Sequence, residues 1–393
     1  MTPTPVFPQA RTCPHLPPKG YAELRDGEPL RRVRLYSGQT AWLVTKYEQA
    51  RTLLLDPRLS SDRRNPGFPV ISVQVELLTE RKRQALIGMD PPEHDAQRRM
   101  FLPDFTVKKA RERRPDIERI VHGALDRMLA GGSPGDLFRD FALPVPFMVI
   151  CRLLGAPWDD HEFFQDAIRR LVRTFDTAEG RQAGAELLSY FERLVVEHER
   201  RPGPGLIGRL AGTRRISRDD LALAAMSLLI AGHETTASMI ALGAVTLLEH
   251  PDQLAEFRAD PDAVAPAVEE LLRYQSIADS ANIRVATADI EIAGVLVKAG
   301  EGILIPASIA NRDAGVFAAP DAFDIHRGAG NHIAFGYGRH QCLGQNLARL
   351  ELQVALTALF DRVPTLRLAV PADQLVARPP GAIQGIDALP VSW

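Results

Sequence analysis

Cysteine is scarce in this sequence, which has only Cys13, Cys151 and Cys342 among its 393 residues. The three lie too far apart for a disulfide framework or for the closely spaced thiols of a structural zinc site. We expect Cys151, in an apolar helical stretch, to lie in the core, and Cys13, in a proline-rich start, to be inert. The scarcity fits the reducing environment of the cytoplasm.

An excess of charge of one sign is also lacking. The chain has 47 Lys and Arg against 49 Asp and Glu, a formal charge of −2, and only six of its basic residues are lysine. Such a balance argues against a nucleic-acid partner. No signal-peptide pattern opens the chain, nor does a membrane anchor, which would need about 20 apolar residues. We expect a cytoplasmic protein without a membrane partner and, since no interface signal stands out, a monomer.

Helical periodicity dominates the sequence, which is 45% hydrophobic and has no internal repeat. We expect one domain over 1–393, mainly α with small β-sheets at one side (α+β). The predicted helices cover 45–57, 93–101, 107–131, 138–154, 159–174, 179–200, 218–249, 252–258, 263–274 and 344–361. The predicted strands cover 31–36, 41–45, 282–286, 289–292 and 302–305, the segment 60–80 is expected to be a loop, and the tail to hold one hairpin.

Cys342 is the most informative cysteine, because it lies in the run FGYGRHQCLG, between a glycine-rich loop and an amphipathic helical pattern. A thiolate at a helix start is stabilised by the helix dipole and by free backbone N–H groups, so we expect a lowered pKa and a good metal ligand. Gly336, Gly338 and Gly344 lack a Cβ and would let a flat cofactor approach closely, and Phe335 would shield the sulfur.

Taken alone, this thiol is compatible with a nucleophile, a zinc ligand or a core residue. A nucleophile needs an oriented base, and His340 has no evident third partner. Zinc needs more thiols or histidines nearby. The remaining motifs of the chain therefore decide between these roles.

The longest predicted helix, 218–249, is apolar almost all round in its first half and is expected to be buried. Ser217 is its predicted N-cap, with Asp220 three residues later, and Pro251 is expected to end it. At about 1.5 Å per residue it would cross the whole domain. The polar run His233 to Thr236 near its middle shows that it is not a membrane span.

Two interpretations of this polar run stay open. In the structural one, threonine hydroxyls bond back to the carbonyls of the preceding turn and Glu234 pairs with an arginine. In the functional one, the helix opens locally to admit O2 and water, and an acid and an alcohol relay protons. A buried, unpaired carboxylate is costly, so Glu234 needs one of these explanations.

The pattern F-G-x-G-x-H-x-C-x-G resembles the heme-binding loop of the cytochrome P-450 superfamily, and Ala231-Gly232-His233-Glu234-Thr235-Thr236 resembles its oxygen-binding motif. The resemblance covers nearly the whole chain and is strongest to soluble, actinomycete-type members. It implies a triangular helical domain with a long central helix, and heme b (iron protoporphyrin IX) with Cys342 as axial thiolate. Glu234 and Thr235 would be the catalytic acid and alcohol, and His233 is expected on the surface side of the helix.

Further residues match by the same resemblance. His94, Arg98, Arg284 and His332 would bind the heme propionates. Glu270, Arg273 and Arg327 would form a buried structural network under the heme loop. The other residues implied in cofactor binding are Ala231, Gly232, Phe335, Gly336 and Gly344.

The implied activity is O2- and electron-dependent hydroxylation or epoxidation of a bulky, mostly apolar small molecule, such as a macrolide, polyketide, terpenoid or steroid. A ferredoxin and a ferredoxin reductase would supply electrons from NAD(P)H, with Arg98, Arg99 and Arg339 facing the partner. Oxidative ring formation, coupling or desaturation on the same heme is an alternative, and a non-enzymatic heme-thiolate sensor a remote one. Segments 61–88, 168–182, 226–230, 277–283 and 383–384 would face the substrate.

Overall fold

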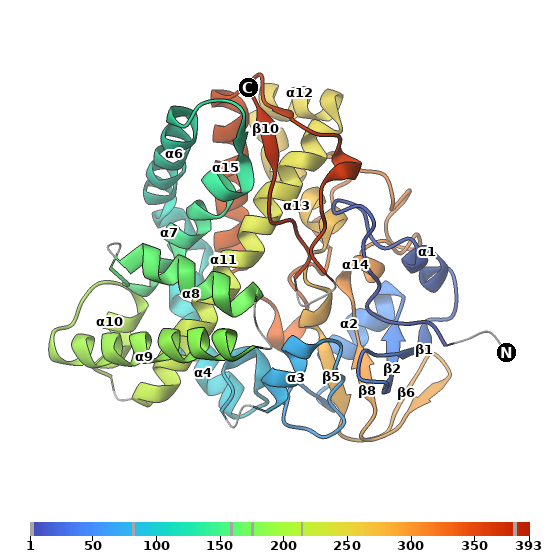
Figure 1. The fold of residues 1–393 in the computed structure, drawn as a ribbon. Coiled ribbons are helices and arrows are strands. Elements are labelled where there is room, and N and C mark those ends of the chain that lie inside the picture. Colours follow the sequence, from blue (N-terminus) through green and yellow to red (C-terminus); the bar gives the residue numbers. More distant parts are fainter. Residues whose placement is uncertain (1–3, 81–82, 158–159, 174–176, 214, 380–382) are drawn as a thin grey trace.

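The computed structural model describes residues 4–393 apart from 81–82, 158–159, 174–176, 214 and 380–382. In Figure 1 most helices fill the left and top of the molecule, the largest sheet and the β6–β7 hairpin (290–297) lie at the lower right, and β10 (Pro390–Ser392) lies at the top. The expectation of a mainly helical fold with small sheets is confirmed.

The helices have the following bounds: α1 Gly20–Arg25, α2 Tyr47–Leu55, α3 Val73–Thr79, α4 Glu93–Phe101, α5 Val107–Glu112, α6 Arg114–Ala130, α7 Pro144–Leu154, α8 His161–Arg173, α9 Ala178–Arg200, α10 Gly205–Ala211, α11 Arg218–Leu248, α12 Pro251–Ala259, α13 Val264–Gln275, α14 Ala307–Ala310 and α15 Gln345–Arg362.

The largest sheet has the strand order β1-β2-β8-β5-β3, in which only the β2–β8 pair is parallel. Its strands are β1 Leu30–Arg34, β2 Thr40–Val44, β3 Leu59–Ser60, β5 Ile283–Ala286 and β8 Gly302–Leu304. A second sheet joins β4 Gly135–Asp136, β10 Pro390–Ser392 and β9 Arg367–Leu368, and a hairpin joins β6 Ile290–Ile292 to β7 Val295–Val297.

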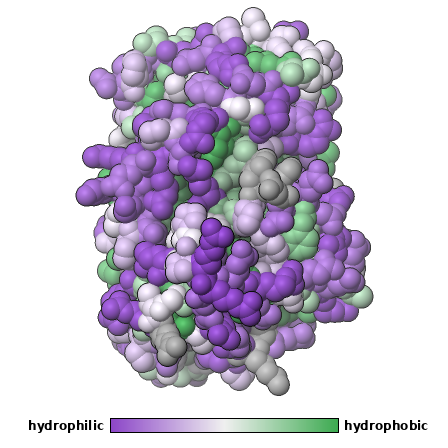
Figure 2. All heavy atoms as spheres, turned by 90° about the vertical axis from the view of Figure 1, so that its left-hand side faces the viewer, coloured by the Kyte–Doolittle hydropathy of each residue, from purple (hydrophilic) through white to green (hydrophobic). Residues whose placement is uncertain are grey.

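Helix α11 runs through the middle of the molecule and packs against α7, α9, α13 and α15. The side-chain oxygen of Ser217 accepts a hydrogen bond from the Asp220 N–H at 3.1 Å, as the predicted N-cap requires. By length and composition α11 could cross a membrane, but 72% of its most apolar 18-residue window is buried inside the protein. Helix α11 is therefore the core helix of the fold. On the outside, hydrophilic side chains dominate the face of the molecule shown in Figure 2.

Some predicted elements are wrong in detail. The helix predicted over 107–131 is two helices, α5 and α6, because Pro115 has no backbone N–H and occupies the first turn of the second. The segment predicted over 138–154 begins with a π-helical turn before Pro144 starts α7. The predicted loop 60–80 contains α3, capped by Ser72. Residues 159 and 174, at the ends of another predicted helix, lie outside the described residues.

Candidate active site

The loop that carries Cys342 is held by its own backbone. A short 3-10 turn, Gly338–His340, precedes the cysteine, and α15 begins three residues after it. The Cys342 N–H donates to the Phe335 carbonyl at 2.8 Å, which closes the loop. The side chain of Cys342 is solvent-accessible although protein surrounds it.

The expected fall of the Cys342 pKa is wrong for the polypeptide alone. Burial raises the pKa of this thiol, and this effect outweighs the backbone N–H groups of Gly344 and Gln345 and the charges of Arg98 and Arg349, all of which lower it. The backbone N–H groups at the helix start therefore lower the thiol pKa, as predicted, but by less than burial raises it. A cation at the sulfur would reverse the balance, because metal coordination deprotonates a thiol.

The glycines of the loop have different roles. Gly338 has a φ of 72°, and a Cβ there would lie 2.8 Å from the Leu54 carbonyl oxygen, so the turn itself requires glycine. Gly336 also has a positive φ, of 70°. A Cβ on Gly344 would instead meet only the Cys342 sulfur, at 4.0 Å. Gly344 therefore keeps the space beside the sulfur clear.

Helix α11 has an accessible stripe in its otherwise buried middle. Ala231 is exposed, and Thr235, one turn later, is half-buried, whereas Thr236 and the residues that follow it to Leu247 are buried. The Thr235 hydroxyl donates to the Ala231 carbonyl at 2.6 Å. The predicted local opening of the helix is wrong: α11 is α-helical over its whole length, and the hydroxyl bonds back as in the structural interpretation.

The residues between Ala231 and Thr235 contact other parts of the protein. A Cβ on Gly232 would lie 3.1 Å from Ile150 Cδ1, so this glycine permits close packing of α11 on α7. The placement of His233 on the surface side is wrong, because the ring is buried at 2% exposure and packs edge-on against Phe147. The Glu234 carboxylate pairs with Arg378 at 2.8 Å, on a C-terminal segment that the sequence patterns did not single out.

A cluster of cationic and imidazole groups lies beside the loop. The rings of His94 and His340 are in contact, with centroids 4.1 Å apart and planes tilted by 43°. Burial and the charge of Arg284, followed by those of His94, Arg98 and Arg339, lower the pKa of His340 to about 2. This places Arg284 and Arg98, on separate elements, around one pair of rings.

The two arginines of this cluster are short of partners. Arg284 is 4% exposed and donates to the Ile283 carbonyl, and burial lowers its pKa to about 10. Arg98 donates to the Gln341 carbonyl, and burial lowers its pKa too. Among the described residues neither forms an ion pair with a carboxylate. Buried cations without anions are costly, so the cluster fits a ligand that carries carboxylates.

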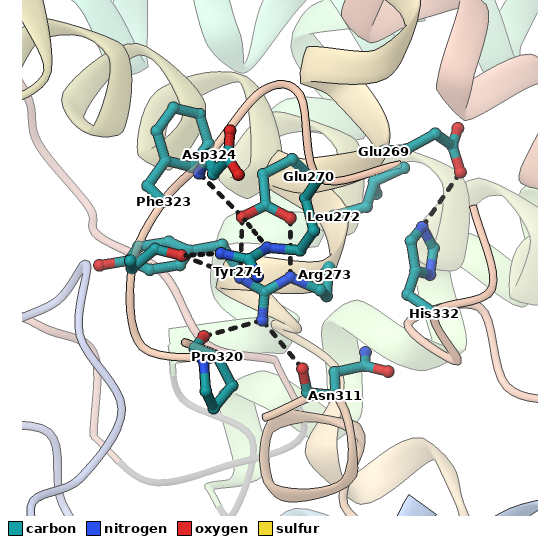
Figure 3. Close-up of polar contacts among 12 residues, drawn as sticks. Glu269, Glu270, Leu272, Arg273, Tyr274, Asn311, Pro320, Phe323, Asp324 and His332 are labelled. Carbon is teal, nitrogen blue, oxygen red and sulfur yellow. Dashed lines mark hydrogen bonds and ion pairs between the residues drawn. The ribbon is translucent and has the colours of Figure 1, made fainter. Parts of the chain in front are cut away.

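His332 does not belong to this cluster, although sequence reasoning placed it there. Its Nε2 lies 3.2 Å from Glu269 Oε2 (Figure 3). Its Nδ1 accepts a hydrogen bond from the Ala334 N–H at 3.1 Å. Burial acts to raise the pKa of Glu269, but hydrogen bonds from His332 and Arg349 hold it at about 2. His340, which the sequence analysis treated only as a possible base, takes the expected place of His332.

The structure brings together the predicted network under the loop. Arg273 is fully buried and donates to both carboxylate oxygens of Glu270 at 2.7 and 2.8 Å, and also to the carbonyls of Asn311 and Pro320 (Figure 3). Arg327 donates to Glu270 at 3.0 Å. These bonds tie α13 to the segment before the loop, which is a structural role.

The residues present therefore fit a heme. A thiol lies beside a clear space at a helix start, and an alcohol lies on an accessible stripe of α11. Two arginines that form no ion pair within the described part of the chain, together with two histidines, suit the heme propionates. The guanidinium of Arg349 also stacks on the Phe335 ring, 4.6 Å from its centroid, and fixes that ring near the cysteine.

Comparison with known proteins identifies the family that the sequence motifs resemble. The cytochrome P-450 family model matches residues 208–364. The chain is 57% identical to vitamin D3 dihydroxylase of Streptomyces griseolus, over 100% of this chain and 98% of the relative. It is 52% identical to pentalenic acid synthase of Streptomyces avermitilis, over 99% of this chain and 97% of the relative.

A solved structure of similar fold is mycinamicin VIII C21 methyl hydroxylase from Micromonospora griseorubida, bound to mycinamicin VIII. It has a TM-score of 0.92 and 43% sequence identity, and covers 99% of this chain and 100% of its own. The chain therefore belongs to the cytochrome P-450 family, the heme-thiolate monooxygenases.

Proposed function

We propose that this enzyme hydroxylates or epoxidises a bulky, mostly apolar small molecule, such as a macrolide, polyketide, terpenoid or steroid. The main support is the accessible stripe of α11 at Ala231 and Thr235. The stripe continues toward the half-buried Ile230 and Ser227, and buried apolar side chains flank it along the helix. Such a lining suits an apolar molecule with few polar groups. Relatives named for vitamin D3 dihydroxylation and for hydroxylation of mycinamicin VIII support this class.

Individual residues are assigned the following roles. The heme supplies O2 activation when bound, and thiolate ligation favours O–O cleavage. Cys342 is proposed as its axial ligand, and Arg98, Arg284, His94 and His340 as the groups that neutralise and orient its propionates.

Proton delivery is assigned to α11. The Glu234 carboxyl carries a proton inward, and the Thr235 hydroxyl passes a proton on from the accessible side of the helix. In this structure the two groups do not bond to each other, since Thr235 donates to Ala231 and Glu234 pairs with Arg378.

Electrons are proposed to come from a ferredoxin, which a reductase recharges from NAD(P)H. Arg99 on α4 and Arg339 in the Cys342 loop are both exposed and lie near Asp95, which Arg339 meets at 3.6 Å. Exposed cations there suit an acidic partner. We also propose that the protein works as a monomer in the cytoplasm.

A Thr235→Ala variant tests the relay. We expect it to consume O2 and NAD(P)H but to release hydrogen peroxide in place of oxidised product, with a substrate found by screening compounds for a ferric spin-state change. Thr246→Ala is the matched control, because the Thr246 hydroxyl also bonds back along α11, to the Leu242 carbonyl at 2.8 Å, but is buried at 1% exposure. Full coupling of electrons to product in Thr235→Ala would remove the assigned role.

A further inference from the structure

Glu234 is held by a residue more than a hundred positions away in the chain. Arg378 Nη1 donates to Glu234 Oε2 at 2.8 Å and to Ser238 Oγ at 3.3 Å, and Arg378 Nε donates to Asp387 Oδ1 at 2.8 Å. The side chains of Arg378 and Glu234 are 11% and 13% exposed, whereas that of Asp387 is 50% exposed. One guanidinium therefore joins an inner carboxylate to an outer one.

The backbone that carries Arg378 is fixed against α11. Ala377 and Ile386 form an antiparallel bridge, and the Arg378 N–H donates to the Gly385 carbonyl at 2.9 Å. A Cβ on Gly385 would lie only 2.6 Å from Ser238 Oγ, so glycine is needed for this close approach to the helix. In Figure 1 the red C-terminal segment crosses the middle of the molecule accordingly.

The Arg378 side chain is constrained on a further side. Its guanidinium carbon lies 5.3 Å from the centroid of the Phe138 ring, within cation–π distance. A guanidinium with a planar fork and several fixed partners holds a carboxylate in one orientation better than an ammonium group does. The Glu234 carboxylate is thus fixed in place, not free to sample rotamers.

The orientation of the Glu234 carboxylate matters for the relay because of the geometry of the α-helix. Consecutive residues of an α-helix do not face each other, so Glu234 and Thr235 point to different sides of α11. A relay that uses both needs the carboxylate at a defined place beside the helix. Nothing on α11 itself supplies an ionic partner for Glu234 among the described residues; Arg378 does.

We propose that Arg378 is a positioning residue for proton delivery, because it fixes the Glu234 carboxylate at the midpoint of α11. The inference rests on the proposed relay through Glu234 and Thr235. It gives Arg378, on the C-terminal segment, a part in catalysis without contact to the reacting atoms.

The test compares Arg378→Gln, Arg378→Lys, Glu234→Gln and the double variant Arg378→Gln/Glu234→Gln in the heme-loaded enzyme. Arg378→Gln should lower kcat for product about tenfold and raise the peroxide yield, with the substrate dissociation constant within about twofold. Arg378→Lys should recover only part of the coupling, since it restores the charge but not the planar fork that orients the carboxylate. Arg362→Gln is the control, because Arg362 forms a comparable 2.7 Å pair with Asp126 on the surface of α15.

A second measurement does not depend on turnover. Urea unfolding of the same variants should show that the double variant loses no more stability than the more affected single variant, as expected when the two residues act as a pair. Additive losses in unfolding, or additive losses in kcat, would overturn the inference.

The two proposals fail in different ways. If Glu234→Gln and Thr235→Ala both leave coupling intact, the relay itself is wrong. If Glu234→Gln uncouples the enzyme but Arg378→Gln behaves as wild type, the relay stands and the role of Arg378 is wrong.

Discussion

At the scale of single residues, His332 and His340 show what decides a role. Both flank the same glycine-rich turn, and the family resemblance implied His332 as a propionate partner. The deciding group is Glu269, a carboxylate on α13 that pairs with His332 at 3.2 Å. His340 instead contacts the His94 ring among three arginines. Spacing along the chain does not reveal which histidine meets the half-buried carboxylate of Glu269.

Replacing Arg284 should weaken heme retention. Arg284→Ala removes a buried cation that has no carboxylate partner among the described residues, and a hydrogen bond to a charged group contributes about 1.5–3 kcal/mol, or about ten- to a hundredfold in heme dissociation. Heme transfer to an acceptor protein measures this rate. His332→Gln, on the Glu269 side, should change the heme dissociation rate far less; an equal effect of both changes would contradict the assignment.

At the scale of elements, α11 shows the limits of local patterns. Its start at Ser217 and its burial follow from capping and composition, and the structure has both. The polar run in its middle suggested an opening, but the Thr235 hydroxyl satisfies the Ala231 carbonyl and Gly232 meets Ile150. Those partners lie one turn away or on another helix. A pattern that marks a functional residue therefore need not mark a break in the backbone.

The glycines of the Cys342 loop give a prediction at the same scale. Gly338→Ala should cost about 1–3 kcal/mol of unfolding free energy, because its φ is 72° and its Cβ would meet the Leu54 carbonyl at 2.8 Å. Gly344→Ala, at an ordinary φ of −82°, should leave the unfolding free energy of the heme-free protein within about 0.5 kcal/mol.

The same two variants should separate in heme binding. The added methyl of Gly344→Ala would stand in the space beside the Cys342 sulfur and should weaken heme binding or shift its spectrum. Chemical unfolding and heme titration of both proteins provide the comparison. Wild-type stability in Gly338→Ala, or unchanged heme binding in Gly344→Ala, would show that the loop tolerates side chains.

At the scale of the whole molecule, the site is assembled from distant segments. Five segments contribute side chains to the site: α4, the middle of α11, β5, the Cys342 loop and the C-terminal segment. The resemblance to a known family supplied the loop, the helix motif and most of the cation cluster. It did not supply Arg378, because an isolated arginine in a loop carries no pattern. That Arg378 pairs with Glu234 is seen only in the folded chain.

Docking of the electron donor belongs to this scale too. Changing the exposed pair Arg99→Glu and Arg339→Glu together should weaken ferredoxin binding, and wild-type binding should weaken as salt rises, because exposed charges are screened within about 10 Å at 0.1 M ionic strength. Surface plasmon resonance at several salt concentrations checks this, and the single change Arg367→Glu on β9 controls for a charge reversal outside the proposed docking surface. Binding that shows no salt dependence and survives the double change would refute a docking surface on the cysteine side.

The most direct test of the whole account is the spectrum of the reduced, carbon-monoxide-bound protein. A thiolate-ligated heme held by Cys342 predicts a Soret band shifted to the red. Cys342→Ser should abolish that shift, while Cys13→Ser should keep it. A wild-type band without the shift, or a red-shifted band that persists in Cys342→Ser, would contradict the assignment of Cys342 as the axial ligand.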